Sequence, residues 1–249
     1  MARQLLIYNS AVPVSAARQG DVSVEANDSF AFSADVNAVP LMAVEFPRAA
    51  AEYAIVFTAE GENVMPAVIL GVRNAQNLYL TPDSRWKADY IPAFIRRYPF
   101  VFSSGDGKSL TLCIDESHPG VNRLGKGNAL FGADNKPTPY VEKVLEFLKE
   151  FQIQFERTRQ FCRHIKELQL LEPMQANVTT PQGEKIALGG FLGVKRERLR
   201  QLSGEQLEKL VKTDELELLY LHLASLSNFT DFKDRLAGAQ TADAGTKAT

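Results

Sequence analysis

Between residues 53 and 115 the hydrophobic residues gather in short runs that are typical of β-strands. The runs are rich in β-branched and aromatic side chains and are bounded by Gly, Asn or Pro. They cover residues 53–58, 66–72, 77–81, 98–104 and 109–115. The segments AEGEN and RNAQ between the first three runs are short enough for hairpin connections, and GDGK at 105–108 is a strong turn signal. The pattern therefore predicts an antiparallel sheet.

A long amphipathic pattern follows at residues 139–171. Its apolar residues recur at intervals of three, four and seven, and charged residues occupy the opposite face. The apolar positions are Val141, Val144, Leu148, Phe151, Phe155, Cys162 and Ile165. Thr138 suits the N-cap, and Pro139 suits the first helical position, where its missing N–H costs nothing. An unbroken helix would be about 50 Å long at ~1.5 Å per residue. We therefore expect it either to bend near 152–158 or to project towards a partner.

The last third of the chain predicts a short hairpin and then helices. The strand-like segments QANVTT and EKIALGGFLGV flank the turn PQGE at 181–184. Ser203 and Gln206 have the spacing of a capping box, and a second apolar series runs from Leu216 to Leu226. The tail at 237–249 has nothing to bury, and we expect it to be disordered. We predict an α+β fold in which residues 1–236 form a single globular domain.

Composition narrows the class of protein. The chain has 249 residues, 45% of them hydrophobic and 23% charged, and a net charge of -2, which suits a globular chain with a real core. Nucleic-acid binders usually carry a basic surplus, so we expect no nucleic-acid partner. The apolar runs are far below the ~18 residues of a membrane span, and the N-terminus lacks the apolar region of a secretory signal. We expect a soluble, cytoplasmic protein.

The cysteines and histidines do not predict a metal site or a cofactor. Cys113 and Cys162 lie far apart with no CxxC spacing, so two buried, reduced thiols are expected. His118, His164 and His222 are scattered singly, without the HExxH spacing of a zinc site.

Two other short motifs are weak. In GKG at 125–127 the lysine is not followed by Ser or Thr at the start of a helix, so we expect a surface loop and not a phosphate loop. The segment CIDESH places Asp115, Glu116 and His118 together after a strand. It lacks the second histidine of a facial triad, and a solvated loop is expected there.

Two adjacent arginines, Arg96 and Arg97, lie inside the apolar segment YIPAFIRRYPFVF. Neighbouring side chains point to opposite faces of a strand and lie about 100° apart on a helix, so the two cannot face one pocket squarely. We expect one to be structural, bonded to a carboxylate and stacked on an aromatic ring. The candidates for these contacts are Asp89, Asp115, Glu116, Trp86 and Tyr98. Arg97 is expected to be the structural one, because Tyr98 and Phe100 beside it have the pattern of core residues. The other arginine is expected to face solvent, an anionic small ligand or a partner.

The chain resembles the bacterial SapC family. The resemblance is carried by NLYLTPDSRW, YIPAFIRRYPFVF, LTLCID, NALFGADNKPTP and LYLHLASLSN, in that order. It spans about residues 53–226, and RRYPF with the upstream Trp86 is its most distinctive part. The family name is linked to paracrystalline surface layers (S-layers) of bacteria. It is shared with a peptide-transport permease, which does not fit a chain without a membrane span. The resemblance carries no catalytic residues over to this chain.

Two classes of function follow. The resemblance implies a non-enzymatic binding or accessory protein of a bacterial cell-surface system, either an S-layer or outer-membrane transport, with a protein partner or a second copy. The alternative is a small-molecule sensor or an enzyme with a pocket near Arg96 and Arg97. The expected binding residues are Arg96, Arg97, Trp86, Tyr98 and Asp115. The family name suggests the cell surface, whereas the N-terminus favours the cytoplasm.

Overall fold

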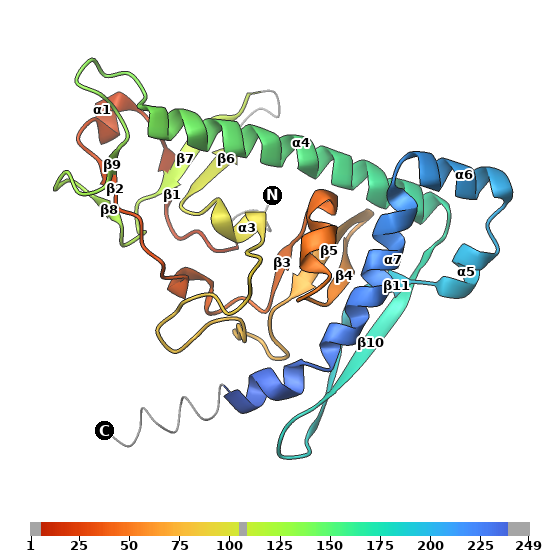
Figure 1. The fold of residues 1–249 in the computed structure, drawn as a ribbon. Coiled ribbons are helices and arrows are strands. Elements are labelled where there is room, and N and C mark those ends of the chain that lie inside the picture. Colours follow the sequence, from red (N-terminus) through yellow and green to blue (C-terminus); the bar gives the residue numbers. More distant parts are fainter. Residues whose placement is uncertain (1–5, 105–108, 239–249) are drawn as a thin grey trace. The chain divides into compact units, whose positions relative to one another are not determined.

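The computed structural model describes residues 6–104 and 109–238 and combines helices with antiparallel sheets (Figure 1). This confirms the predicted α+β fold. The described chain divides into two compact units. The first consists of Met1–Ser33 with Ala93–Ile153, and the second of Ala34–Pro92 with Gln154–Thr249. The boundary between the units falls inside the long helix α4 (Pro139–Glu167), so part of this helix belongs to each unit. The predicted single domain over residues 1–236 stays a prediction.

The first unit contains two small antiparallel sheets. One has the order β1-β7-β6 and the other the order β8-β2-β9. The strands are β1 (Ala11–Pro13), β2 (Ser23–Val24), β6 (Phe100–Ser103), β7 (Thr111–Asp115), β8 (Val121–Asn122) and β9 (Asn128–Ala129). The helical elements are α1 (Ala16–Gln19), η2 (Ala31–Ser33), α3 (Ala93–Arg96) and the first part of α4. The core is the cluster Val22, Val24, Phe100, Ile114, Leu130, Val141 and Leu148. Apolar residues of α4 therefore pack with the strands, as their helical spacing predicts.

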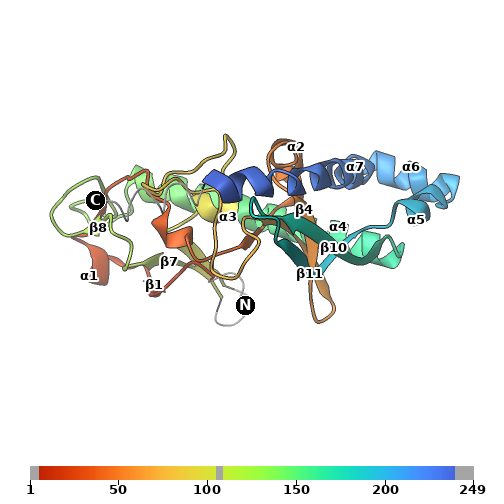
Figure 2. The same ribbon diagram turned by 90° about the horizontal axis from the view of Figure 1, so that it is seen from below.

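The second unit is built on a five-stranded antiparallel sheet with the order β10-β11-β4-β5-β3. Its strands are β3 (Ala38–Pro40), β4 (Ile55–Glu60), β5 (Asn63–Ile69), β10 (Leu171–Thr179) and β11 (Lys185–Val194). Its helical elements are η3 (Ala43–Glu45), α2 (Phe46–Ala49), α5 (Arg196–Arg200), α6 (Gly204–Lys212), α7 (Glu215–Ser225) and η4 (Leu226–Phe229). Figure 2 shows α7 running along the sheet, where it contacts β4 and β11. Gly61, with φ +57°, makes the tight turn between β4 and β5.

Most of the predicted strands are present. The runs 53–58, 66–72, 98–104 and 109–115 overlap β4 to β7, although each strand starts or ends a few residues away from the prediction. The turn expected at 105–108 lies outside the described residues. The strand expected at 77–81 is wrong, because this segment forms a loop with one isolated bridge, Leu80 to Trp86. The Asn77 side chain accepts a hydrogen bond from the amide of Tyr79, and Thr81 bonds to Arg85. These local bonds replace a strand ladder.

The long helix begins at Pro139, as predicted, and differs from its prediction at the other end. Thr138 is the residue before the helix, but its hydroxyl donates to the carbonyl of Ala129 and does not cap an amide. Helical residues run without interruption through 152–158, and the bend there or the projection towards a partner stays a prediction. The helix ends at Glu167, four residues early, where Gln169 adopts φ +57° and the amide of Leu170 bonds back to Ile165.

The described helices include none that is both long and apolar enough to cross a membrane. At the other end of the predicted tail, Ala237 and Gly238 belong to a helical stretch that begins at Phe232. The rest of that tail, 239–249, lies outside the described residues.

Candidate functional site

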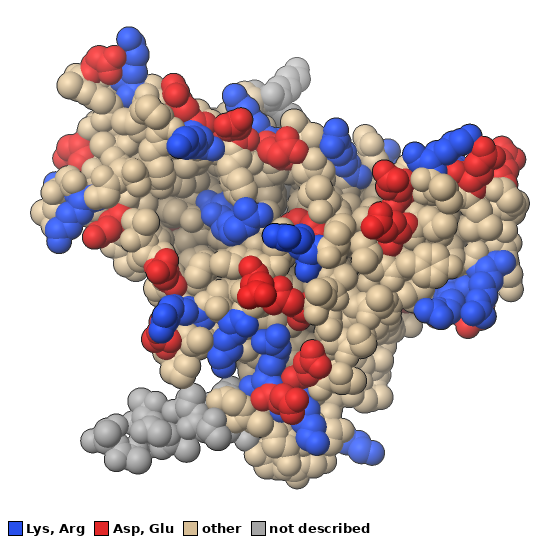
Figure 3. Space-filling view, in the orientation of Figure 1, with Lys and Arg blue, Asp and Glu red and all other residues tan. Residues whose placement is uncertain are grey.

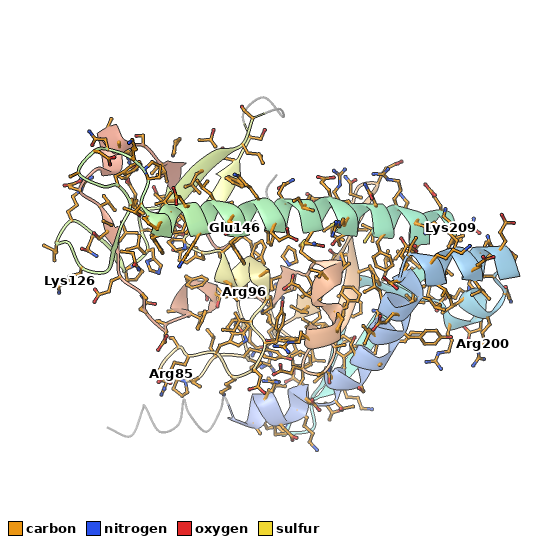
Figure 4. The ribbon with its side chains drawn as sticks, turned by 45° about the horizontal axis from the view of Figure 1, so that its top comes forward. Arg85, Arg96, Lys126, Glu146, Arg200 and Lys209 are labelled. Atoms are coloured by element: carbon orange, nitrogen blue, oxygen red, sulfur yellow. The ribbon has the colours of Figure 1, made fainter. Side chains whose placement is uncertain are left out.

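Arg96 and Arg97 lie at the end of the short helix α3, and they differ sharply in burial. Arg96 is exposed, whereas Arg97 is only 4% exposed. Successive residues of a helix point about 100° apart, so this divergence follows from the backbone. Figure 4 shows Arg96 on α3, next to the part of α4 that carries Glu146. The two adjacent arginines therefore lie in different environments, Arg97 in the interior and Arg96 at the surface.

Arg97 lies in a cage of aromatic rings. Its guanidinium carbon is 4.2 Å from the ring centre of Phe94, 4.8 Å from that of Phe151 and 5.6 Å from that of Tyr8. The hydroxyl of Tyr8 donates to the carbonyl of Phe100 at 2.6 Å and accepts a hydrogen bond from Arg97. Burial lowers the pKa of Arg97 from its ordinary value, and Tyr8 opposes that shift. Arg97 thus joins α3, α4 and the N-terminal segment within the first unit.

Asp115, at the end of β7, is fully buried. The hydrogen-bond donors to its carboxylate come from groups other than the two arginines. Its carboxylate accepts hydrogen bonds from the amides of Asn9 (2.7 Å), Ser10 (3.1 Å) and Ser117 (3.0 Å) and from the Ser117 hydroxyl (2.7 Å). Burial alone would raise the pKa of Asp115. These hydrogen bonds outweigh burial and lower the pKa below its ordinary value. Among the described residues, neither Arg96 nor Arg97 bonds to this carboxylate.

A bidentate arginine–carboxylate pair is nevertheless present beside it. Arg18 of α1 donates to both oxygens of Glu116, at 2.9 and 2.7 Å, and Gln19 adds a third bond at 3.0 Å. The hydrogen bonds from Arg18 and Gln19 lower the pKa of Glu116 to about 2. Arg18 is 98 positions away in the chain, and no sequence signal joins it to Glu116.

Tyr98 lies at the centre of a second aromatic group in the first unit. Its ring stacks on Phe32 at 4.0 Å between ring centres and is 5.3 Å from the rings of both Tyr8 and His118. Its hydroxyl is 3.4 Å from the Asp115 carboxylate, and burial followed by that charge raises the pKa of Tyr98 to about 12. Tyr98 and Asp115 therefore lie close together, and Tyr8 connects Tyr98 to Arg97.

Trp86 belongs to the second unit, in a cluster of its own. Its indole N–H donates to the hydroxyl of Tyr53 at 2.7 Å, and its ring stacks on Tyr79. Arg235 lies 3.7 Å above the ring of Tyr79. No sequence pattern indicates this cluster, because Arg235 comes from the far end of the chain. The distinctive Trp86 and the arginine pair are thus assigned to different units.

Arg96 lies over an aromatic ring on the exposed face of α4. Its guanidinium carbon is 5.4 Å from the ring centre of Phe147. Phe147 belongs to a shallow, open hollow along this face, and Ile153 at its end is 48% exposed. The lining residues are Glu142, Lys143, Glu146, Phe147, Lys149, Glu150 and Ile153. Figure 3 shows acidic and basic side chains close together along the helix. We call this surface, with Arg96, the Arg96 face.

Four other side chains that could take part in chemistry are buried, namely Asp115, His118, Cys113 and Cys162. The solvated loop expected for CIDESH is wrong, because Asp115 and His118 are both buried. His118 accepts a hydrogen bond from the amide of Gly120 at 3.0 Å, and burial lowers its pKa. Burial also raises the pKa of Cys113 and raises that of Cys162 to about 12, so both thiols are protonated at neutral pH. Within the described ranges, no group of three or more His, Cys, Asp or Glu side chains is placed to hold a metal ion.

Comparison with known proteins gives one match. No curated protein and no solved structure matches the chain. The model of the SapC family matches residues 14–232, which cover the larger part of both units. The matched range contains Trp86, Arg96, Arg97, Tyr98 and Asp115. The chain therefore belongs to the SapC family.

Proposed function

We propose that the chain is a non-enzymatic binding or accessory protein that holds a protein partner against the Arg96 face. The observation that carries this proposal is the difference in burial and contacts between the two arginines. Arg97 is buried among rings, whereas Arg96 is exposed over Phe147 on an open helix face. Arginine and aromatic residues are the side chains most enriched at the centres of protein–protein contacts.

The shape of the Arg96 face favours a protein over a small molecule. Small-molecule sites are enclosed clefts that surround most of the ligand. The hollow on α4 is open along its length and is lined by carboxylates and lysines on either side of Phe147 and Ile153. An apolar strip with a charged rim is the usual composition of a protein interface.

The buried ionisable groups support the same reading. Asp115 holds the N-terminal segment through backbone amides, and His118 accepts an amide bond in its own loop. Groups that are already engaged in this way hold the fold together. The cell-surface part of the proposal, an S-layer or an outer-membrane transport system, rests on the association of the SapC family name and on no feature of the geometry.

Site-specific photo-crosslinking in the source bacterium tests the proposal. A photo-reactive amino acid replaces Ile153 on the Arg96 face. Leu124, which is 77% exposed in the same unit, is the control position. We expect a discrete protein adduct from position 153 that is absent from position 124. Equal labelling at the two positions, or turnover of a small substrate by the purified chain, would contradict the proposal.

A further inference from the structure

Helix α7 of the second unit is apolar on almost every side. Leu219, His222 and Ser225 are buried on its inner side, towards the sheet. Its outer side carries Leu216 and Tyr220, which are one helical turn apart. A helix that is apolar all round is typical of one covered on all sides, yet Tyr220 is 53% exposed.

The exposed apolar residues of α7 continue onto α6. Val211, near the end of α6, is 56% exposed and shares a shallow hollow with Leu216 and Tyr220. Asp214 and Glu217 complete the lining of this hollow. Asp214 adopts φ +60° just before α7, which turns the chain between the two helices. We call these five residues the α6–α7 corner. It is an apolar patch with two carboxylates at its rim, and neither carboxylate forms an ion pair within the described residues.

The complementary charge lies on the same unit. The short helix α5 and the residue before it hold Lys195, Arg196, Arg198 and Arg200, and Figure 4 shows Arg200 on this helix. In Figure 3 a basic group stands over α5, separated by uncharged surface from the acidic groups near α7. Arg196 and Arg200 are exposed, and neither is ion-paired within the described part of the chain.

We propose that the α6–α7 corner is a two-fold contact with a second copy of this chain. In such a contact each surface meets its own counterpart, so a residue i that touches j is matched by j touching i. Tyr220, Leu216 and Val211 pack against the same residues of the second copy. The carboxylates of each corner face α5 of the other copy. One chain thus supplies both the acidic rim and the basic helix that complements it.

This contact is distinct from the Arg96 face and goes beyond the proposed function. The Arg96 face belongs to the first unit, whereas α5, α6 and α7 all belong to the second. The two proposals can therefore fail separately.

The mass of the full chain in solution tests the contact. Light scattering after size exclusion should give a dimer for the wild type and a monomer for Tyr220→Asp, because a buried carboxylate opposes burial of the patch. The matched control is Leu124→Asp, at an exposed apolar residue of the other unit, and it should remain a dimer. Circular dichroism checks that both variants are folded. A monomeric wild type at all concentrations, or a dimeric Tyr220→Asp, overturns the proposal.

A charge exchange identifies the second copy as the occupant. Glu217→Arg and Arg200→Glu should each raise the dimer dissociation constant about tenfold, since like charges then meet across the contact. The double variant restores opposite charges and should return to near the wild-type constant. If the double variant dimerises no better than the single ones, the charges do not meet and the two-fold arrangement is wrong.

Discussion

Asp115 shows how a single residue fixes the N-terminal segment of the first unit. A buried carboxylate needs donors, and Asp115 receives the amides of Asn9 and Ser10 from one side and the two donors of Ser117 from the other. The same segment continues into β1, which pairs with β7. In this pairing Ala11 lies opposite Asp115. The charge at the end of β7 therefore anchors the strand that lies beside it.

Replacing Asp115 by Asn should destabilise the chain. The amide nitrogen of Asn brings donors to a place where backbone donors already point, and charge-assisted bonds are lost. Each hydrogen bond to a charged group contributes about 1.5–3 kcal/mol, so a loss of about 2–3 kcal/mol in the free energy of unfolding is expected. Urea unfolding measures it, with Asp28→Asn, at an exposed aspartate of the same unit, as control. A change in Asp115→Asn no larger than in the control would contradict this role.

Replacing Arg97 should also destabilise the chain, for a different reason. Arg97→Met keeps much of the stem but loses the cation over Phe94 and Phe151 and the bond to Tyr8. Desolvated cation–π contacts contribute about 2 kcal/mol, so a loss of about 2–3 kcal/mol is expected. Arg96→Met, at the exposed neighbour, should change stability by less than about 0.5 kcal/mol. Equal losses for the two variants in thermal and urea unfolding would show that the cage is not stabilising.

At the scale of elements, His222 joins α7 to the sheet of the second unit. Its Nδ1 donates to the carbonyl of Ile55 in β4 at 2.9 Å, and its Nε2 accepts from the amide of Val194 in β11 at 3.0 Å. The bond from Val194 needs the neutral ring, because a protonated Nε2 cannot accept, whereas the bond to Ile55 can form in either state. Burial lowers the pKa of His222 from 6.5 to about 4, against the opposing effect of the Ile55 carbonyl.

This shift predicts a pH dependence of stability. Because the folded pKa is lower than the unfolded one, the unfolded chain takes up the proton first as the pH falls. Stability from this group is complete above about pH 6.5 and is lost between pH 6.5 and 4, by about 3 kcal/mol in all.

The control is His222→Gln, which can still donate and accept but does not titrate. Its free energy of unfolding should change less between pH 7 and pH 5 than that of the wild type. Identical pH profiles of the two chains in urea unfolding would contradict the assignment.

The elements that could be predicted from sequence are those set by local signals. Gly61 marks the turn between β4 and β5, and the Ser203–Gln206 capping box is present with both of its hydrogen bonds. Strands of two or three residues, such as β1 and β2, carry too few positions for a pattern to show. Their pairing depends on partners about a hundred residues away, which a local pattern does not encode.

In the candidate site, too, local features could be predicted from the sequence and long-range contacts could not. The divergence of Arg96 and Arg97 follows from backbone geometry at two adjacent residues. The partners of Arg97 do not, because Tyr8 and Phe151 come from segments far apart in the chain. Likewise, the Glu116 carboxylate, a predicted partner of Arg96 or Arg97, is paired with Arg18.

At the scale of the whole molecule, the two proposed contacts belong to different units and should be separable. Tyr220→Asp should abolish the dimer and leave crosslinking from position 153 unchanged. Arg96→Ala should do the reverse. Light scattering and crosslinking on the same two variants measure this. Loss of both properties in either variant would show that partner binding and self-association depend on one surface.

In the proposed function, Arg96 binds a partner while its neighbour Arg97 holds the fold. The test is the yield of the adduct from position 153 in the source organism for wild type, Arg96→Ala and Arg85→Ala. Arg85 is an exposed arginine of the second unit and serves as the matched control. Arg96→Ala should lose most of the adduct, about tenfold or more, with an unchanged unfolding free energy, while Arg85→Ala should behave as wild type. An undiminished adduct in Arg96→Ala would contradict the proposed function.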